Sequence, residues 1–127
     1  EIDALVREGA GSGTSGVAGV ETTILSGDPN KHGPYAIEIR VPPNTRIAAH
    51  SHRDDRFAMV VAGEWSFGYG ETADDTNMKT MVVGAFYTEP AGAPHFASTG
   101  DEPAVVYITG FGPTDTRYLT TDVGGSK

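Results

Sequence analysis

Two histidines separated by one residue, His50 and His52, lie in the stretch RIAAHSHRDDRFAMVVAGEW, residues 46–65. On a β-strand, residues two apart point to the same face, so both imidazoles would project together and could bind one ion. Imidazole is a ligand for iron, copper, nickel, zinc and manganese. The pair alone is also compatible with two ordinary surface or core histidines, so a metal site requires a further ligand.

A third histidine, His95, follows in the stretch GAFYTEPAGAPHF, residues 84–96. Proline fixes one backbone angle and glycine permits angles that other residues avoid, so PAGAPH is expected to form a tight turn. This turn would deliver His95 onto a new strand. A histidine presented from a second strand is what a site with three nitrogen ligands needs.

The segments that must position these histidines are short and rich in β-branched and aromatic residues, and 17 glycines and 8 prolines punctuate the chain. This pattern is typical of an all-β sandwich or barrel. In YAIEIRV, residues 35–41, apolar and charged residues alternate, which predicts a strand with one buried face. The other expected strand segments are residues 56–63, 64–70, 79–90, 95–99 and 104–112.

The chain length of 127 residues suits one domain, which can bury a core without disulfides, and the chain has no cysteine. Residues 1–19 contain the Gly/Ser-rich stretch EGAGSGTSGVAG and are expected to be flexible or extended. We expect the folded domain to cover residues 20–119 and to be followed by a flexible tail, residues 120–127.

The net charge of −8 argues against nucleic acid as a partner, because such partners require a basic surface that faces the phosphates. It also argues against docking on an anionic membrane. No run of about 18 or more apolar residues is present, so no membrane-spanning segment is expected. The chain begins at Glu1, which is compatible with a removed signal peptide. Both an exported, periplasmic protein and a cytoplasmic one therefore fit the sequence.

The first histidine stretch resembles the first motif of the cupin family. That motif runs from a glycine through His-x-His and a glutamate to a second glycine. Asn44 replaces the first glycine, and asparagine tolerates the left-handed turn geometry that glycine supplies. The matching residues of this chain are Asn44, His50, His52, Arg56 and Gly63.

The second stretch resembles the second cupin motif, which runs from a glycine through Pro-x-Gly and a histidine to an asparagine. Thr99 replaces that asparagine, and we expect its role to be structural. The flanking stretches LSGDP (25–29) and GFGP (110–113) make the chain similar to small single-domain bacterial cupins. The matching residues of the second motif are Gly84, Pro90, Gly92, His95 and Thr99.

This resemblance implies an all-β cupin jelly roll, a sandwich or small barrel, in a single domain. It implies a divalent transition metal (iron, manganese, nickel, zinc or copper) held by His50, His52 and His95. It further implies enzymatic chemistry on a small organic molecule, with a dioxygenase favoured and an isomerase or lyase behind it. A non-catalytic binding or sensing module is the alternative. Cupins often pair through edge strands, so we expect a homodimer.

Arg56 stands where the motif has a glutamate, and arginine offers no lone pair to a metal. Three interpretations stay open. Arg56 could act as a catalytic residue that holds a substrate carboxylate above a three-histidine site; a carboxylate such as Asp54, Asp55 or Glu38 could complete the shell; or the site could bind no catalytic metal. A surface ion pair with Asp54 or Glu64 is the ordinary alternative for Arg56. If Arg56 faces inward, an acidic group should lie beside it.

The remaining candidates have simpler explanations. His32 lies in a turn containing glycine and proline, and we expect an exposed loop histidine. Trp65, Phe67 and Tyr69 share one face of a strand and are expected to pack in the core, with the wall of a substrate pocket as the alternative. Three tyrosines could bring a phenol near the metal, and the sequence does not select among them: Tyr35, Tyr87 and Tyr107.

Overall fold

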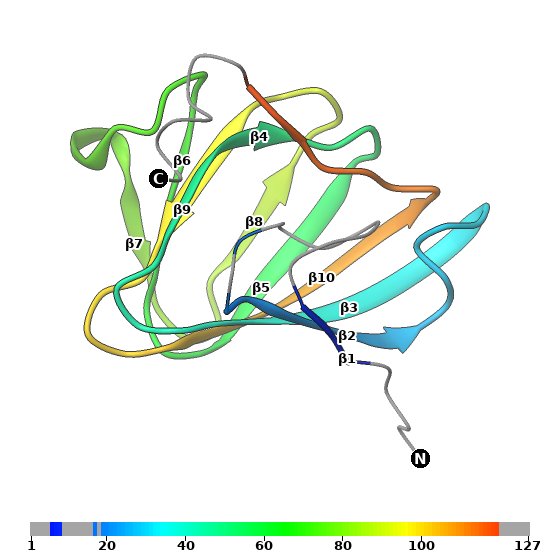
Figure 1. Ribbon diagram of the computed structural model, residues 1–127, viewed down its shortest axis with the longest axis horizontal. Coiled ribbons are helices and arrows are strands. Elements are labelled where there is room, and N and C mark those ends of the chain that lie inside the picture. Colours follow the sequence, from blue (N-terminus) through cyan, green and yellow to red (C-terminus); the bar gives the residue numbers. More distant parts are fainter. Residues whose placement is uncertain (1–5, 9–16, 18, 120–127) are drawn as a thin grey trace.

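The computed structural model describes residues 6–8, 17 and 19–119 of the chain. Its strands form two antiparallel sheets that pack face to face (Figure 1). Apart from one turn of 3₁₀ helix, η1 (Asp75–Asn77), every regular element in this part of the chain is a strand. The expected all-β sandwich is therefore confirmed.

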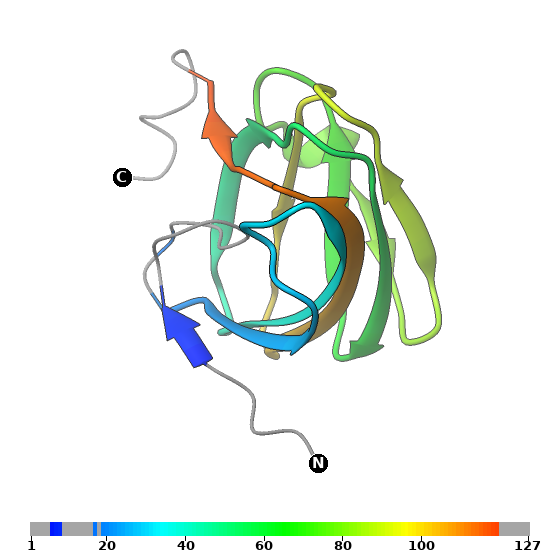
Figure 2. The ribbon, with the colours of Figure 1, turned by 90° about the vertical axis from the view of Figure 1, so that its right-hand side faces the viewer.

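The larger sheet has six strands and the smaller sheet has five. The larger sheet has the spatial order β1 (Val6–Glu8), β2 (Glu21–Ser26), β3 (Gly33–Val41), β10 (Ala104–Gly112), β5 (Arg56–Ala62) and β8 (Phe86–Glu89). The smaller sheet has the order β11 (Arg117–Tyr118), β4 (Arg46–Ser51), β9 (His95–Ser98), β6 (Trp65–Tyr69) and β7 (Lys79–Met81). Seen nearly end-on, the strands curve around a common interior (Figure 2).

From β3 onward the chain alternates between the two sheets, except for the hairpin of β6 and β7. As a result β4 pairs with β9 in one sheet, and β5 pairs with β8 in the other. The first motif is carried by β4 and β5, and the second by β8 and β9. The crossing pattern therefore brings the two motifs together, although β6, η1 and β7 lie between them in the chain.

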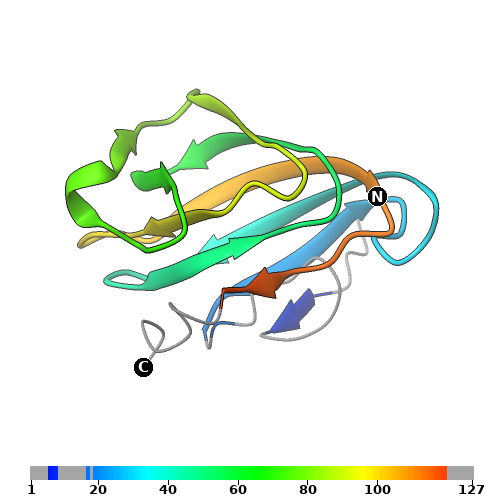
Figure 3. The same ribbon diagram turned by 90° about the horizontal axis from the view of Figure 1, so that it is seen from above.

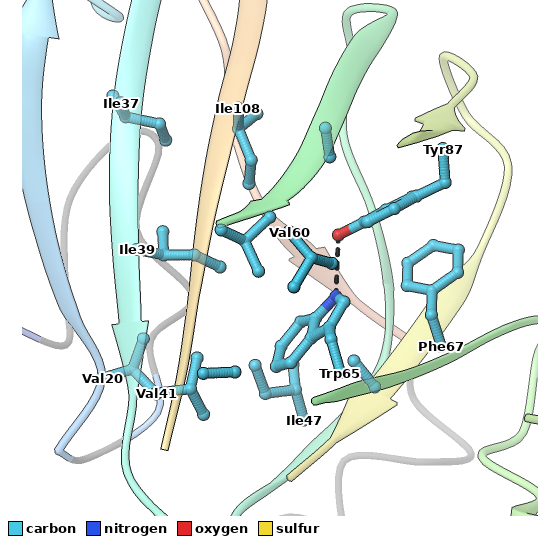
Figure 4. Close-up of a cluster of buried hydrophobic side chains, with 14 of the residues drawn as sticks. Val20, Ile37, Ile39, Val41, Ile47, Val60, Trp65, Phe67, Tyr87 and Ile108 are labelled. Atoms are coloured by element: carbon cyan, nitrogen blue, oxygen red, sulfur yellow. Dashed lines mark hydrogen bonds between the residues drawn. The ribbon is translucent and has the colours of Figure 1, made fainter. Parts of the chain in front are cut away.

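As the sequence predicts, buried and exposed side chains alternate along the strands. In β3, Ile37, Ile39 and Val41 are buried while Arg40 is exposed. Trp65 and Phe67 lie in the core, where the indole Nε1 of Trp65 donates a hydrogen bond of 2.8 Å to the hydroxyl of Tyr87 (Figure 4). The expectation for Tyr69 is wrong. Tyr69 ends β6 and is exposed at the rim, where its hydroxyl donates to the carbonyl of Thr88.

The expected strand segment 79–90 is divided, because β7 and β8 belong to different sheets. A turn separates them, in which the Ala85 amide donates to the Val82 carbonyl at 2.9 Å. Gly84 has a φ of 93°, which few other residues adopt. Asn44 likewise has a φ of 53°, so asparagine does supply the left-handed geometry expected of it. The Thr99 hydroxyl accepts from the Thr45 amide at 2.9 Å, which is a structural role.

Within the segment 1–19, residues 6–8 form β1, which pairs with β2 at the outer edge of the larger sheet (Figure 1). The remainder of that segment, apart from residues 17 and 19, and the expected tail 120–127 lie outside the described residues. Within residues 6–8, 17 and 19–119, no helix has the length and apolarity needed to cross a membrane.

Candidate metal centre

The structure brings the three predicted histidines together between the two sheets. His50 lies opposite His95 in the pairing of β4 with β9, and His52 follows two residues later. The register of this pair shifts between Ile47 and His50, an irregularity of the kind that re-aims side chains beside functional sites. All three histidines are buried, and one ligand nitrogen from each lies within 4.8 Å of the others.

Hydrogen bonds fix which ring nitrogen of each histidine faces the centre. Each Nδ1 lies beside a backbone carbonyl, which can only accept, so each Nδ1 carries the proton. The Nε2 atoms therefore present their lone pairs, as in histidines that bind metals. The bonds run from His50 to Ala48 (2.7 Å), from His52 to Asp115 (2.6 Å) and from His95 to Ala93 (3.2 Å).

The surroundings keep these rings neutral. Burial, followed by the proximity of His95, lowers the pKa of His50 to about 3. Burial, followed by the charge of Arg56, lowers the pKa of His52 to about 2. Burial also lowers the pKa of His95. Because a metal binds only the neutral imidazole, these rings are ready to bind an ion at ordinary pH.

Glu89 is a functional candidate that the sequence reasoning missed. It ends β8, is 4% exposed, and directs its Oε1 to within 3.5 Å of His52 Nε2 and 3.6 Å of His95 Nε2. A signal was available, because Glu89 shares the inward face of its strand with Tyr87, two residues earlier. It also directly precedes the PAGAPH turn that delivers His95.

Arg56 is buried, 4% exposed, so its expected alternative of a surface ion pair is wrong. It lies directly opposite Glu89 in the pairing of β5 with β8, and its Nε donates to Glu89 Oε1 at 3.0 Å. The acidic neighbour expected for an inward arginine is thus Glu89. Burial alone would raise the pKa of Glu89, but Arg56 and the imidazoles lower it to about 2. The carboxylate is therefore ionised.

The three carboxylates considered from the sequence have other partners. The Asp54 carboxylate accepts from the hydroxyls of Tyr35 (2.7 Å) and Thr114 (2.6 Å). The Asp55 carboxylate accepts from the Ala91 amide at 2.7 Å and so holds the PAGAPH turn. The Glu38 carboxylate pairs with the exposed side chain of Arg40 at 2.9 Å.

The three candidate tyrosines occupy different environments in the structure. The Tyr35 hydroxyl is committed to Asp54, and Tyr107 is 40% exposed on the outer face of the larger sheet. Tyr87 is buried and shares the inward face of β8 with Glu89. Burial, followed by the Glu89 carboxylate, raises its pKa well above the usual value. Its phenol therefore stays protonated. His32 is exposed, as expected.

The histidines face a small cavity of about 30 Å³, which is enough for a water molecule. This space suits an ion with a water molecule, and an organic molecule can enter only if the surrounding groups move. The cavity walls combine the polar groups above with apolar core residues: Ile39, Ile47, Trp65, Phe67, Ala97 and Ile108.

The segment after β10 closes one side of the centre. It turns back along the sandwich and brings β11 beside β4 (Figure 3). Tyr118 lies opposite His50 in this pairing, with the two ring centres 5.1 Å apart. The Asp115 carbonyl orients His52, and the Asp115 carboxylate accepts from the Arg53 amide at 2.8 Å. This C-terminal segment therefore holds one of the three histidines in place.

Residues 37–110 match the family described as the Cupin domain, which is more than half of the chain. The chain therefore belongs to the cupin family, as its two motifs predict.

The chain is 31% identical over 68 residues to the H2HPP isomerase of Bacillus subtilis. The alignment covers 54% of this chain and 27% of the isomerase, so the chain spans about a quarter of that relative's length.

Solved structures share the fold at lower identity. The DMSP lyase DddQ of Ruegeria pomeroyi DSS-3 superposes with a TM-score of 0.70 and 19% identity, over 95% of this chain and 63% of the lyase. The structure described as Fe(II) HppE superposes with a TM-score of 0.66 and 16% identity, over 86% of this chain and 57% of that one. These likenesses concern the fold.

Proposed function

We propose that this cupin binds a divalent transition metal through His50, His52 and His95 and acts as an enzyme on a small organic molecule. One observation carries the proposal. Within the described residues, the Nε2 atoms of His52 and His95 are buried and have no hydrogen-bond partner. Both face the ionised Glu89 carboxylate.

Two lone-pair nitrogens and an anionic oxygen that face one another without a proton between them repel each other. A buried polar atom left without a partner costs free energy. A cation that accepts all these lone pairs removes both problems. When bound, iron, manganese, nickel, zinc or copper would supply Lewis-acid or redox chemistry at this point.

We also propose that Arg56 contacts an acidic group of the substrate. Its Nη1 is buried and, among the described residues, has no hydrogen-bond partner, while its Nε is occupied by Glu89. A guanidinium with a buried nitrogen that lacks a partner is suited to receive a carboxylate oxygen. In that case Arg56→Lys, which keeps the charge and loses the planar fork, should weaken binding of small carboxylic acids to the metal-loaded protein.

The reaction type is a further part of the proposal. A dioxygenase is our first choice, and the Fe(II) form of a structural neighbour is compatible with it. An isomerase or lyase comes second, since a relative and a neighbour carry those names. The cavity of about 30 Å³ favours one other candidate, a non-catalytic metal-binding module. Oxygen uptake by the iron-loaded protein with a panel of small carboxylic acids would separate the first choice from the module.

The metal itself is tested by elemental analysis of protein purified without chelator. The variant with His50, His52 and His95 all changed to alanine provides the comparison. The wild type should carry close to one equivalent of a transition metal and the variant almost none. Equal metal content in the two proteins would overturn the proposal.

We further propose that the chain forms a homodimer. Tyr107, Met59 and Phe86 lie side by side in register across β10, β5 and β8, and all three are exposed on the outer face of the larger sheet. β8 is an edge strand of that sheet. A second copy that packs on this row would cover both the apolar side chains and the exposed edge.

A further inference from the structure

The structure assigns the fourth ligand of the metal centre to Glu89, a residue of β8, in place of the glutamate that the first cupin motif carries at position 56. This inference rests on the proposed metal site. It replaces a neutral three-histidine shell by a shell with one anionic ligand.

The distances of Glu89 Oε1 from two of the three histidines are those of a shared ion, while the set of ligand atoms that all lie within 4.8 Å of one another comprises the three histidines without Glu89. Four ligands about 2.0–2.1 Å from a tetrahedral ion are roughly 3.3–3.4 Å from one another. Glu89 Oε1 lies 3.5 Å from His52 Nε2 and 3.6 Å from His95 Nε2, within a few tenths of an ångström of that value. Glu89 Oε1 therefore occupies the position of a ligand that binds the same ion as these two nitrogens.

These contacts are not hydrogen bonds. The Nδ1 atoms of His52 and His95 hold the ring protons on backbone carbonyls, so their Nε2 atoms have no proton to give. Neither Nε2 has any hydrogen-bond partner in the part of the chain that the structure describes. A buried carboxylate that approaches two such nitrogens at once is explained by a cation bound to all three.

The carboxylate that the motif would place at position 56 on β5 is found instead at position 89 on β8. Position 56 on β5 lies opposite position 89 on β8, so a carboxylate on either strand can approach the same histidines. A carboxylate oxygen has more than one lone pair, so Oε1 can accept from Arg56 Nε and still bind an ion. Arg56 acts here as a positioning residue that keeps a buried anion paired.

The experiment compares metal binding by Glu89→Gln with the wild type, and Glu38→Gln serves as a matched control because Glu38 pairs with Arg40 instead. Affinity for Co²⁺ and Zn²⁺ is measured by competition with a chromophoric chelator. We expect a loss of about tenfold or more for Glu89→Gln and no change for Glu38→Gln. The visible spectrum of bound Co²⁺ should also change in Glu89→Gln, because that spectrum reports the ligands.

Glu89→Gln alone leaves Arg56 buried without its ionic partner, which could unfold the protein. The double variant Arg56→Met with Glu89→Gln removes both buried charges and so avoids this effect. It should melt as cooperatively as the wild type and still lose affinity. If the wild type binds Co²⁺ and Glu89→Gln matches it in affinity and spectrum, the Glu89 assignment is wrong while the three-histidine site stands. If the wild type binds no metal at all, the proposed function itself fails.

Discussion

At the scale of single residues, the Arg56–Glu89 pair is the feature that sets this chain apart from the motif it otherwise follows. Both side chains are almost completely buried, and each is the other's ionic partner. Breaking a buried pair by removing one partner is strongly destabilising, because the other charge stays behind unpaired.

Arg56→Met should therefore lower the free energy of unfolding of the metal-free protein by about 3–5 kcal/mol, as measured by urea denaturation. Arg40→Met is the control, since Arg40 forms an exposed pair with Glu38 and should cost at most about 1 kcal/mol. Similar losses in the two variants would mean that burial of the Arg56 pair does not matter to stability.

The sequence located the histidines because their spacing along two strands is local information. It did not reveal Glu89, because the relation between Glu89 and the histidines runs across strands. That relation depends on the pairing register that places Arg56 opposite Glu89. Residue spacing within one strand carries no information about this register. The sequence pointed instead to Asp54 and Asp55, the carboxylates nearest to Arg56 in the chain. Both have other partners in the structure.

At the scale of elements, the segment after β10 orients a histidine of the candidate metal centre, although its strand is short. β11 has two residues, yet the carbonyl of the preceding Asp115 fixes the ring of His52.

The strands with regular alternation were predicted closely, and segment 104–112 coincides with β10. The segment 79–90 was predicted as one strand segment, and the structure divides it at the turn around Gly84.

Asp115→Ala should lower Co²⁺ affinity by roughly tenfold or more, because the loss of its bond to the Arg53 amide loosens the segment that orients His52. Arg117→Ala is the control on the same segment, since it removes only the exposed ion pair of 3.9 Å with Asp115 and leaves the bond to the Arg53 amide intact. Chelator competition measures both. Unchanged affinity in Asp115→Ala would show that the segment does not support the ligand.

At the scale of the whole molecule, the buried titratable groups make stability depend on pH. The folded protein holds the pKa of His50 near 3 and that of His52 near 2, below the usual 6.5. Below about pH 6.5 the unfolded chain therefore binds more protons than the folded one. The free energy of unfolding consequently decreases as the pH is lowered. Glu89, with its pKa lowered to about 2, adds to the loss below pH 4.5.

We expect the metal-free protein to lose stability progressively from about pH 6.5 down to about pH 3, as followed by thermal unfolding at a series of pH values. The double variant His50→Gln with His52→Gln should show a shallower dependence. His32→Gln, which alters an exposed histidine, should follow the wild type. A wild-type melting temperature constant between pH 6.5 and 4 would contradict the burial of neutral histidines.

The homodimer is tested at the same scale. Phe86→Asp places a charge in the middle of the exposed row on β8, in a side chain that is 63% exposed. Sedimentation velocity at micromolar concentration should show a dimer for the wild type and a monomer for the variant. Thr80→Asp on β7, in the other sheet, is the control and should remain dimeric. A monomeric wild type would disprove the dimer.

The pairing of positions 56 and 89 also bears on how cupins are recognised in genomes. A pattern that demands glutamate in the first motif would discard this chain as one that has lost its metal. A pattern that accepts a carboxylate at either of the two paired positions would retain it. Applied to uncharacterised cupins, that rule would distinguish centres whose carboxylate has moved to the opposite strand from centres that have lost it, and would predict that the two positions vary together.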